Sequence, residues 1–165
     1  MTAKSLSLAL KGLAALGLWL GVWVVLAPGS SWADPPAGAS YVGSQACKEC
    51  HEDQFENYQK YSQKAHSYQS VAKMAKGLTE AELKTCYECH TTGYNKPGGF
   101  VSASQTPHMK DAGCEVCHGP GSAHKESQDP KDIRAKLSIE VCESCHSQER
   151  VAAFNYRPII YGGGH

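Results

Sequence analysis

Apolar residues are concentrated near the start of the chain and are sparse after it. Lys4 and Lys11 precede an apolar run over residues 12–27, and Ser-Trp-Ala follows at 31–33. A basic start, a short apolar stretch and a small-x-small end are typical of a secretory signal peptide. The run of 16 residues is shorter than the roughly 20 that a membrane-spanning helix needs. We therefore predict a signal peptide over 1–33, cleaved before Asp34, with an uncleaved membrane anchor as the alternative.

Two later patterns predict helices. Residues 52–69 are polar, but aromatic or small apolar residues recur in them at helical spacing, namely Phe55, Tyr58, Tyr61, Ala65 and Tyr68. This segment is expected to end at Gly77. Thr79 and Glu82 then form a capping box, which predicts that a helix begins there and runs into Cys86.

In the rest of the chain the sequence predicts short helices separated by loops. Helix starts are predicted at Ser44, at Asp129-Pro130 with a helix through Leu137, and at Ser138. Turns or loops are predicted at 95–99, around His108 and over 118–124, and an extended segment at 158–161. The predicted fold class is mainly α with extensive irregular loops, little or no sheet, and one domain over 34–165.

Candidate chemistry comes from four copies of the motif CxxCH, which account for all eight cysteines. The cysteines are Cys47, Cys50, Cys86, Cys89, Cys114, Cys117, Cys142 and Cys145, and the motif histidines are His51, His90, His118 and His146. In this motif two thiols bind the porphyrin covalently and the adjacent imidazole binds its iron. The sequence predicts four covalent c-type haems.

Four histidines remain outside the motifs: His66, His108, His124 and His165. Four irons need four further ligands to be six-coordinate, and imidazole is the commonest metal ligand. We predict that all four serve as distal ligands. Met109, beside His108, is an alternative ligand.

Other uses of paired cysteines fit less well. Zinc sites also use CxxC pairs, but zinc does not explain a histidine directly after every second cysteine. A disulfide scaffold would pair cysteines across the fold rather than within CxxC. A thioredoxin-like site needs a single CxxC in a βαβ context.

Composition supports a core made largely of haem. In residues 34–165, Leu, Ile, Val and Phe total 16 of 132, a level at which a chain is ordinarily disordered. We predict that the chain does not fold without its haems. The same residues hold 14 basic and 16 acidic side chains, and eight propionates would make the loaded protein acidic. No basic run suggests a nucleic acid partner, whereas charged docking to redox proteins is plausible.

The ordered motifs resemble the cytochrome c-554 family. The likeness lies in residues 41–47 with Ala65-His66, in residues 113–124, and in residues 154–160 followed by His165. The resemblance implies a helical fold around stacked and near-perpendicular haem pairs, and a role in electron transfer. It also implies crossed ligands: His51 with His108, His118 with His66, and His146 with His165, with His124 left for His90. A five-coordinate haem is a known departure in the family.

The function predicted from these features is electron transfer rather than catalysis, because an iron with two imidazoles has no open position. The protein is expected to be exported to the periplasm or beyond, to exchange electrons with redox protein donors and acceptors, and to meet a membrane only through an uncleaved signal. One alternative is a multihaem oxidoreductase with an open haem that acts on a nitrogen or sulfur oxyanion. Another is a subunit of a conductive filament, in which His165 could bind a neighbouring subunit's iron.

Overall fold

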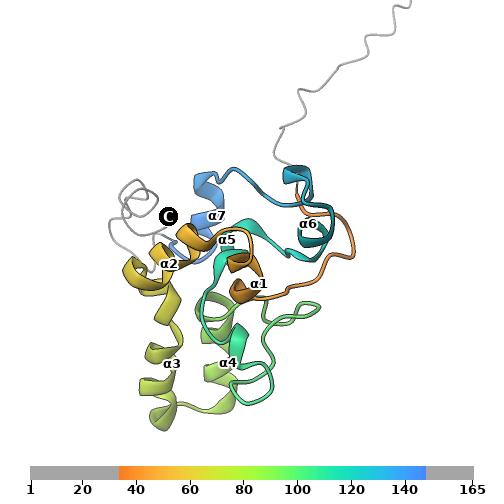
Figure 1. The fold of residues 1–165 in the computed structure, drawn as a ribbon. Helices are drawn as coiled ribbons and strands as arrows, with labels where there is room; N and C mark the ends of the chain where they lie inside the picture. The colour runs from red at the N-terminus through yellow and green to blue at the C-terminus, as the bar shows by residue number, and fades with distance from the viewer. Residues whose placement is uncertain (1–33, 148–165) are drawn as a thin grey trace, which may run out of the picture. The chain divides into compact units, whose positions relative to one another are not determined.

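The computed structural model describes residues 34–147, and their regular structure is entirely helical, as predicted (Figure 1). The α-helices are α1 (Ser44–Lys48), α2 (Glu52–Tyr61), α3 (Tyr68–Met74), α4 (Glu80–His90), α5 (Cys114–His118), α6 (Ser122–Ser127) and α7 (Ile139–Glu143). Short 3₁₀ turns lie at η1 (Gln63–His66), η2 (Ala75–Gly77), η3 (Pro107–Met109) and η4 (Pro130–Asp132). None of these helices is long and apolar enough to cross a membrane.

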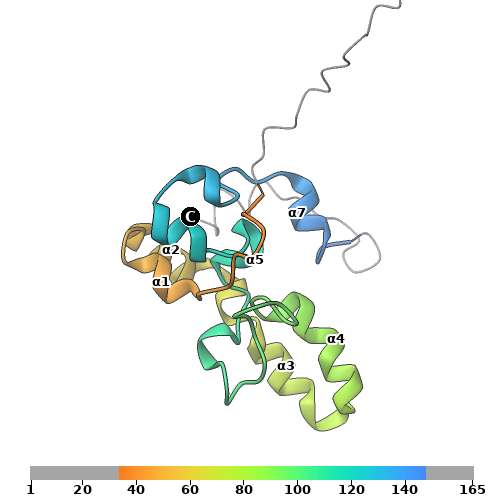
Figure 2. The ribbon, with the colours of Figure 1, turned by 90° about the vertical axis from the view of Figure 1, so that its right-hand side faces the viewer.

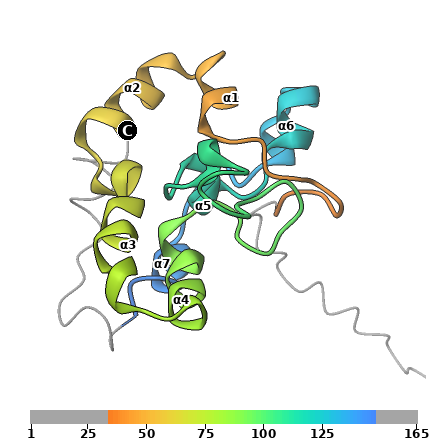
Figure 3. The ribbon, with the colours of Figure 1, turned by 90° about the horizontal axis from the view of Figure 1, so that it is seen from below.

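Helix α5 lies between α1 and α7 in all three views of the ribbon (Figures 1–3). Side-chain oxygens join it to segments that are distant in sequence. The Ser44 hydroxyl accepts a hydrogen bond from the Cys114 amide at 3.0 Å, and the Thr92 hydroxyl accepts one from the Gly113 amide at 2.8 Å. Ser44 was predicted to cap α1, but Gly43 holds that position and α1 has no side-chain cap.

The predicted helical segment after residue 52 is confirmed, but it is broken twice. Ser62 is extended and its hydroxyl accepts from the Lys64 amide, which ends α2 and starts η1. Ser67 separates η1 from α3. The segment ends at Gly77, as predicted. Short hydroxyl side chains favour such breaks because they compete for backbone hydrogen bonds.

Helices α3 and α4 pack as a hairpin joined through η2 (Figure 2). The predicted capping box at the start of α4 is present: Thr79 accepts from the Glu82 amide, and the Glu82 carboxylate accepts from the Thr79 amide at 2.8 Å. Together these bonds satisfy amides that the helix itself leaves without partners. The helix therefore enters the second CxxCH motif as expected.

The region after α5 differs from its prediction. The loop predicted over 118–124 is shorter, because α6 begins at Ser122 and includes His124. Asp129 does cap a helical turn, but the turn ends at Asp132 rather than continuing to Leu137. Tertiary contacts explain this early end, since the Arg134 amide donates to the His118 carbonyl at 3.0 Å. Ser138 precedes α7 without a capping bond from its side chain.

The apolar core of the described residues is small. Its buried members are Tyr58, Ala65, Val71, Phe100, Met109 and Ala112. Four polar or charged residues are buried as well, namely Ser62, Thr91, Thr92 and Glu115. Within the apolar core, the Tyr58 hydroxyl donates to the Ala112 carbonyl. Such a core agrees with the scarcity of aliphatic residues in the sequence. The predicted signal peptide, the segment at 158–161 and His165 lie outside the described residues.

Candidate haem-attachment site

Each CxxCH motif occupies about one turn of helix. The third motif is α5 itself, and the second forms the last turn of α4. In the first and fourth motifs the amide of the histidine donates to the carbonyl of the first cysteine, at 2.9 Å in both His51 and His146. None of the eight cysteines forms a disulfide. The turn therefore presents two thiols and one imidazole from the same short stretch of backbone.

Thiols of different motifs lie near one another. The interaction between the thiols of Cys47, in the first motif, and Cys114, in the third, raises the pKa of Cys47 and lowers that of Cys114. Burial, and then the Cys89 thiol of the second motif, raise the pKa of Cys145 in the fourth. The Cys117 thiol is also close enough to the thiols of Cys142 and Cys145 to interact with them electrostatically. The motifs are thus neighbours in the order first, third, fourth, second, which differs from their order in the sequence.

Ser67 holds the histidine of the second motif with both its backbone and its side chain. Its carbonyl lies 3.0 Å from Nδ1 of His90, and its hydroxyl donates to the His90 carbonyl at 2.9 Å. Because a carbonyl can only accept, Nδ1 must carry the proton, and Nε2 keeps the lone pair. Nε2 is then the nitrogen able to bind a metal.

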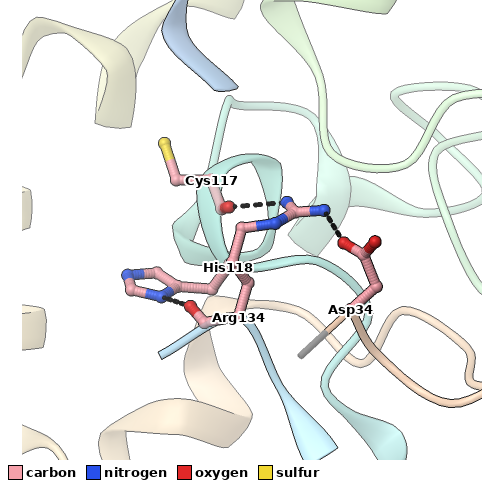
Figure 4. Close-up of polar contacts among 4 residues, drawn as sticks. All are labelled: Asp34, Cys117, His118 and Arg134. Atoms are coloured by element: carbon pink, nitrogen blue, oxygen red, sulfur yellow. Dashed lines mark hydrogen bonds and ion pairs between the residues drawn. The ribbon is translucent and has the colours of Figure 1, made fainter. Parts of the chain in front are cut away.

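Arg134 fixes the histidine of the third motif in a similar way (Figure 4). Its carbonyl accepts from Nδ1 of His118 at 2.7 Å. Its guanidinium donates to the Cys117 carbonyl at 3.0 Å and to the Asp34 carboxylate at 2.7 Å. One residue thus orients the imidazole and also satisfies a carbonyl near the end of α5.

His124 faces the histidine of the first motif. The ring centroids of His51 and His124 are 6.2 Å apart, and the ring planes differ by 22°. A metal bound between two imidazoles by bonds of about 2 Å would place the centroids about 6 Å apart. Nδ1 of His124 lies 2.9 Å from the Asp129 carbonyl, which leaves Nε2 with the lone pair.

The other predicted ligands lie in varied settings. Nε2 of His66 lies 3.1 Å from the Gln59 carbonyl. His108 is exposed and its ring lies against Gly43, while Met109 is buried next to the same glycine. Burial, and then the ammonium of Lys64, lower the pKa of His146, which favours the neutral, metal-binding imidazole.

Comparison with known proteins agrees with the motifs. A family model described as "Cytochrome c554 and c-prime" matches residues 46–119. Cytochrome c-554 of Nitrosomonas europaea is 30% identical over 123 residues, which cover 68% of this chain and 51% of that protein. The chain belongs to the cytochrome c-554 family. It spans about half the length of this curated relative, and no solved structure gives a significant match.

Membership in the cytochrome c-554 family implies covalent haem c, and the donor set fits that group. Every described motif offers two thiols and an imidazole, and in His90, His118 and His124 a backbone carbonyl holds Nδ1. Such outer hydrogen bonds orient histidines that bind metals. Within residues 34–147 no three His, Cys, Asp or Glu side chains converge as a zinc site requires.

The residues that support these candidate ligands are not apparent from the sequence. Ser67, Asp129 and Arg134 act mainly through their backbone carbonyls, which every residue type possesses. Glu115, a variable position of the third motif, is buried and accepts several amide hydrogen bonds. Its acidic side chain inside a haem motif was the one visible signal, but Glu49, Glu88 and Glu143 share that signal and are exposed.

Proposed function

We propose that this protein is an exported electron carrier with four covalent haems c, and not an enzyme. When bound, each haem supplies a one-electron iron couple. The observation that carries the proposal is the proximity of the motifs. Ser44 of α1, the helix that enters the first motif, accepts from the Cys114 amide of the third at 3.0 Å, and the Cys89 thiol of the second motif helps to raise the pKa of Cys145 in the fourth. Cofactors attached at such neighbouring points would lie close enough for electrons to pass along the chain of motifs.

Two histidines are proposed to hold the iron of every haem. The 6.2 Å separation of the His51 and His124 rings supports these two as the ligand pair of the first motif, in place of the His51–His108 pair that the family likeness implied. The Thr92 amide donates to the Met109 carbonyl at 2.9 Å, which brings the backbone beside His108 close to the second motif. This contact supports His108 as the partner of His90.

His66 is proposed as the partner of His118. Lys64, two residues before it, acts electrostatically on Cys117 of the third motif and on Cys142 of the fourth. Segment η1 therefore lies near both of these motifs. His165 is then proposed for His146, as the family likeness implies.

The mature protein is proposed to comprise residues 34–165 and to act in the periplasm or outside the cell, because the sequence begins with a secretory pattern. Its partners would be redox proteins that dock at charged surfaces and not nucleic acids. A filament of such subunits would share this chemistry and differ in particle size in solution.

Low-temperature EPR of the oxidised full-length protein, with haem counted as the pyridine haemochrome, tests the proposal. Four haems per chain, all low-spin, are expected. Fewer haems would contradict the cofactor count, and a high-spin haem would reveal an open iron and favour the oxidoreductase alternative.

The His51–His124 pair has its own test. His124→Ala should turn one haem high-spin in the otherwise natural protein. The same substitution should add no high-spin signal when Cys47→Ser and Cys50→Ser have removed the first haem. A high-spin signal in that second background would assign His124 to another iron.

A further inference from the structure

Glu115 is a charged side chain in a place where charge is costly. It lies inside the third motif with only 1% of its surface exposed. Its Oε2 accepts from the Gly43 amide at 2.7 Å, and its Oε1 accepts from the Gly121 amide at 2.7 Å. The Val42 amide reaches both oxygens, at 3.0 and 3.2 Å.

All of these partners are donors, so both oxygens of Glu115 act as acceptors, as they do in an ionised carboxylate. No Lys, Arg or His of the described residues forms an ion pair with it. Backbone dipoles, rather than an opposite charge, therefore stabilise the carboxylate. A full negative charge is left uncompensated in a region of low dielectric constant.

This charge lies at the junction of the first and third motifs. Its Oε2 accepts from the amide of Gly43, whose carbonyl accepts from the Cys47 thiol at 3.9 Å, and Cys114 directly precedes Glu115 in the chain. Both thiols are attachment points in the proposed function. The haems bound there would sense the same buried carboxylate.

We propose that the charge of the buried Glu115 carboxylate lowers the reduction potential of the two haems attached through the first and third motifs. Reduction adds an electron beside an existing negative charge, so a buried carboxylate favours the oxidised iron. The inference rests on the proposed haem attachment and goes beyond it, because it assigns unequal potentials to the two halves of the series. The first and third haems would be the harder pair to reduce.

The fourth motif supplies a matched control. Glu143 occupies the same place in Cys-Glu-x-Cys-His as Glu115 does, but its side chain is exposed. Water and salt screen an exposed charge, so its effect on a nearby iron is small. The same change of one carboxylate to an amide can therefore be made at a buried and at an exposed position.

The test is a spectroelectrochemical titration of the full-length haem-loaded protein and its Glu115→Gln and Glu143→Gln variants. Haem content and circular dichroism are measured first. In Glu115→Gln, the ratio of reduced to oxidised iron at a fixed electrode potential should rise about tenfold for two of the four haems, which corresponds to about 59 mV for one electron. In Glu143→Gln, every haem should stay within about twofold of the natural protein.

Unchanged titration of all four haems in a fully loaded Glu115→Gln protein would overturn the inference while leaving the proposed function intact. Absence of covalent haem from the natural protein would instead overturn the proposed function. In Glu115→Gln the NH2 group of the new side chain would face backbone N–H donors, which can prevent folding. Glu115→Asp is therefore made in parallel. It keeps the charge and should titrate within about twofold of the natural protein; a tenfold change would show that shape, not charge, controls the potentials.

Discussion

The second and third CxxCH motifs share one local chemistry but are held in opposite ways. The second is the last turn of α4, an 11-residue helix that its own capping box starts. The third is α5, a helix of five residues without a side-chain cap. Ser44, Thr92 and Arg134, all distant in sequence, hold α5 in place.

This difference indicates that the two motifs carry different shares of the fold. Glu115 of the third motif binds the segment before α1 and the loop before α6. The second motif is fixed through Ser67 at one end of the α3–α4 hairpin. Damage at the third motif should spread through the molecule, whereas damage at the second should affect mainly the hairpin and the few segments that it touches.

The largest effects are expected when both cysteines of one motif are replaced, so that a haem cannot attach there. Cys114→Ser with Cys117→Ser should abolish folding, because a haem attached at the third motif would lie where distant segments meet and the apolar core is too small to replace it. Cys86→Ser with Cys89→Ser should leave a folded protein with three haems. Haem content and far-ultraviolet circular dichroism measure both outcomes, and equal damage in the two variants would contradict the comparison.

A smaller effect is expected from adding a methyl group directly after the third motif or in the turn of the α3–α4 hairpin. Gly119, directly after the third motif, has φ +81°, and a Cβ there would lie 2.6 Å from Cγ of Pro35. Gly119→Ala should cost at least about 1–2 kcal/mol for the left-handed backbone. Gly77→Ala, in the hairpin turn, meets no atom within 4 Å and should stabilise by up to about 1 kcal/mol. Denaturant unfolding of the loaded proteins gives both values, and a loss at Gly77 as large as at Gly119 would refute the contrast.

The smallest expected effect tests whether the stability of α4 depends on residues within its own segment. Thr79→Ala removes the capping box and should cost about 1 kcal/mol, with faster amide hydrogen exchange confined to the first turn of α4. Thr85→Ala is the control, since this exposed hydroxyl donates only to the Glu82 carbonyl within the same helix, and alanine is the better helix former. Faster exchange at α5 in Thr79→Ala would show that the hairpin is not independent.

The same contrast explains what could be predicted from the sequence. The capping box of α4, the stop at Gly77 and the helical class follow from neighbouring residues, and all three are confirmed. The helix expected from Asp129 to Leu137 was wrong because Arg134 bonds to the third motif instead. A long-range contact of that kind leaves no periodic trace in a sequence.

In the candidate site too, features set by neighbouring residues could be predicted, whereas contacts between distant residues could not. The cysteines and histidines proposed to attach haem are recognisable because one turn of helix must bring two thiols and an imidazole together. The approach of His124 to His51 joins residues 73 positions apart, and only the fold reveals it. The support of His90 by Ser67 depends partly on a peptide carbonyl, which the sequence cannot distinguish from any other.

The small polar side chains that link the segments reverse the usual pattern of mutational tolerance. In most globular domains aliphatic core positions are the least replaceable, and exposed or polar positions vary freely. Here the hydroxyls of Ser67 and Thr92 each both donate and accept, and so join segments far apart in the chain. Removing one buried methyl group costs about 0.5–1.5 kcal/mol, whereas removing one of these oxygens leaves two backbone groups without that partner, at about 1–3 kcal/mol for each group that stays buried. Descendants of this sequence should therefore exchange their few aliphatic residues freely and retain these two hydroxyls.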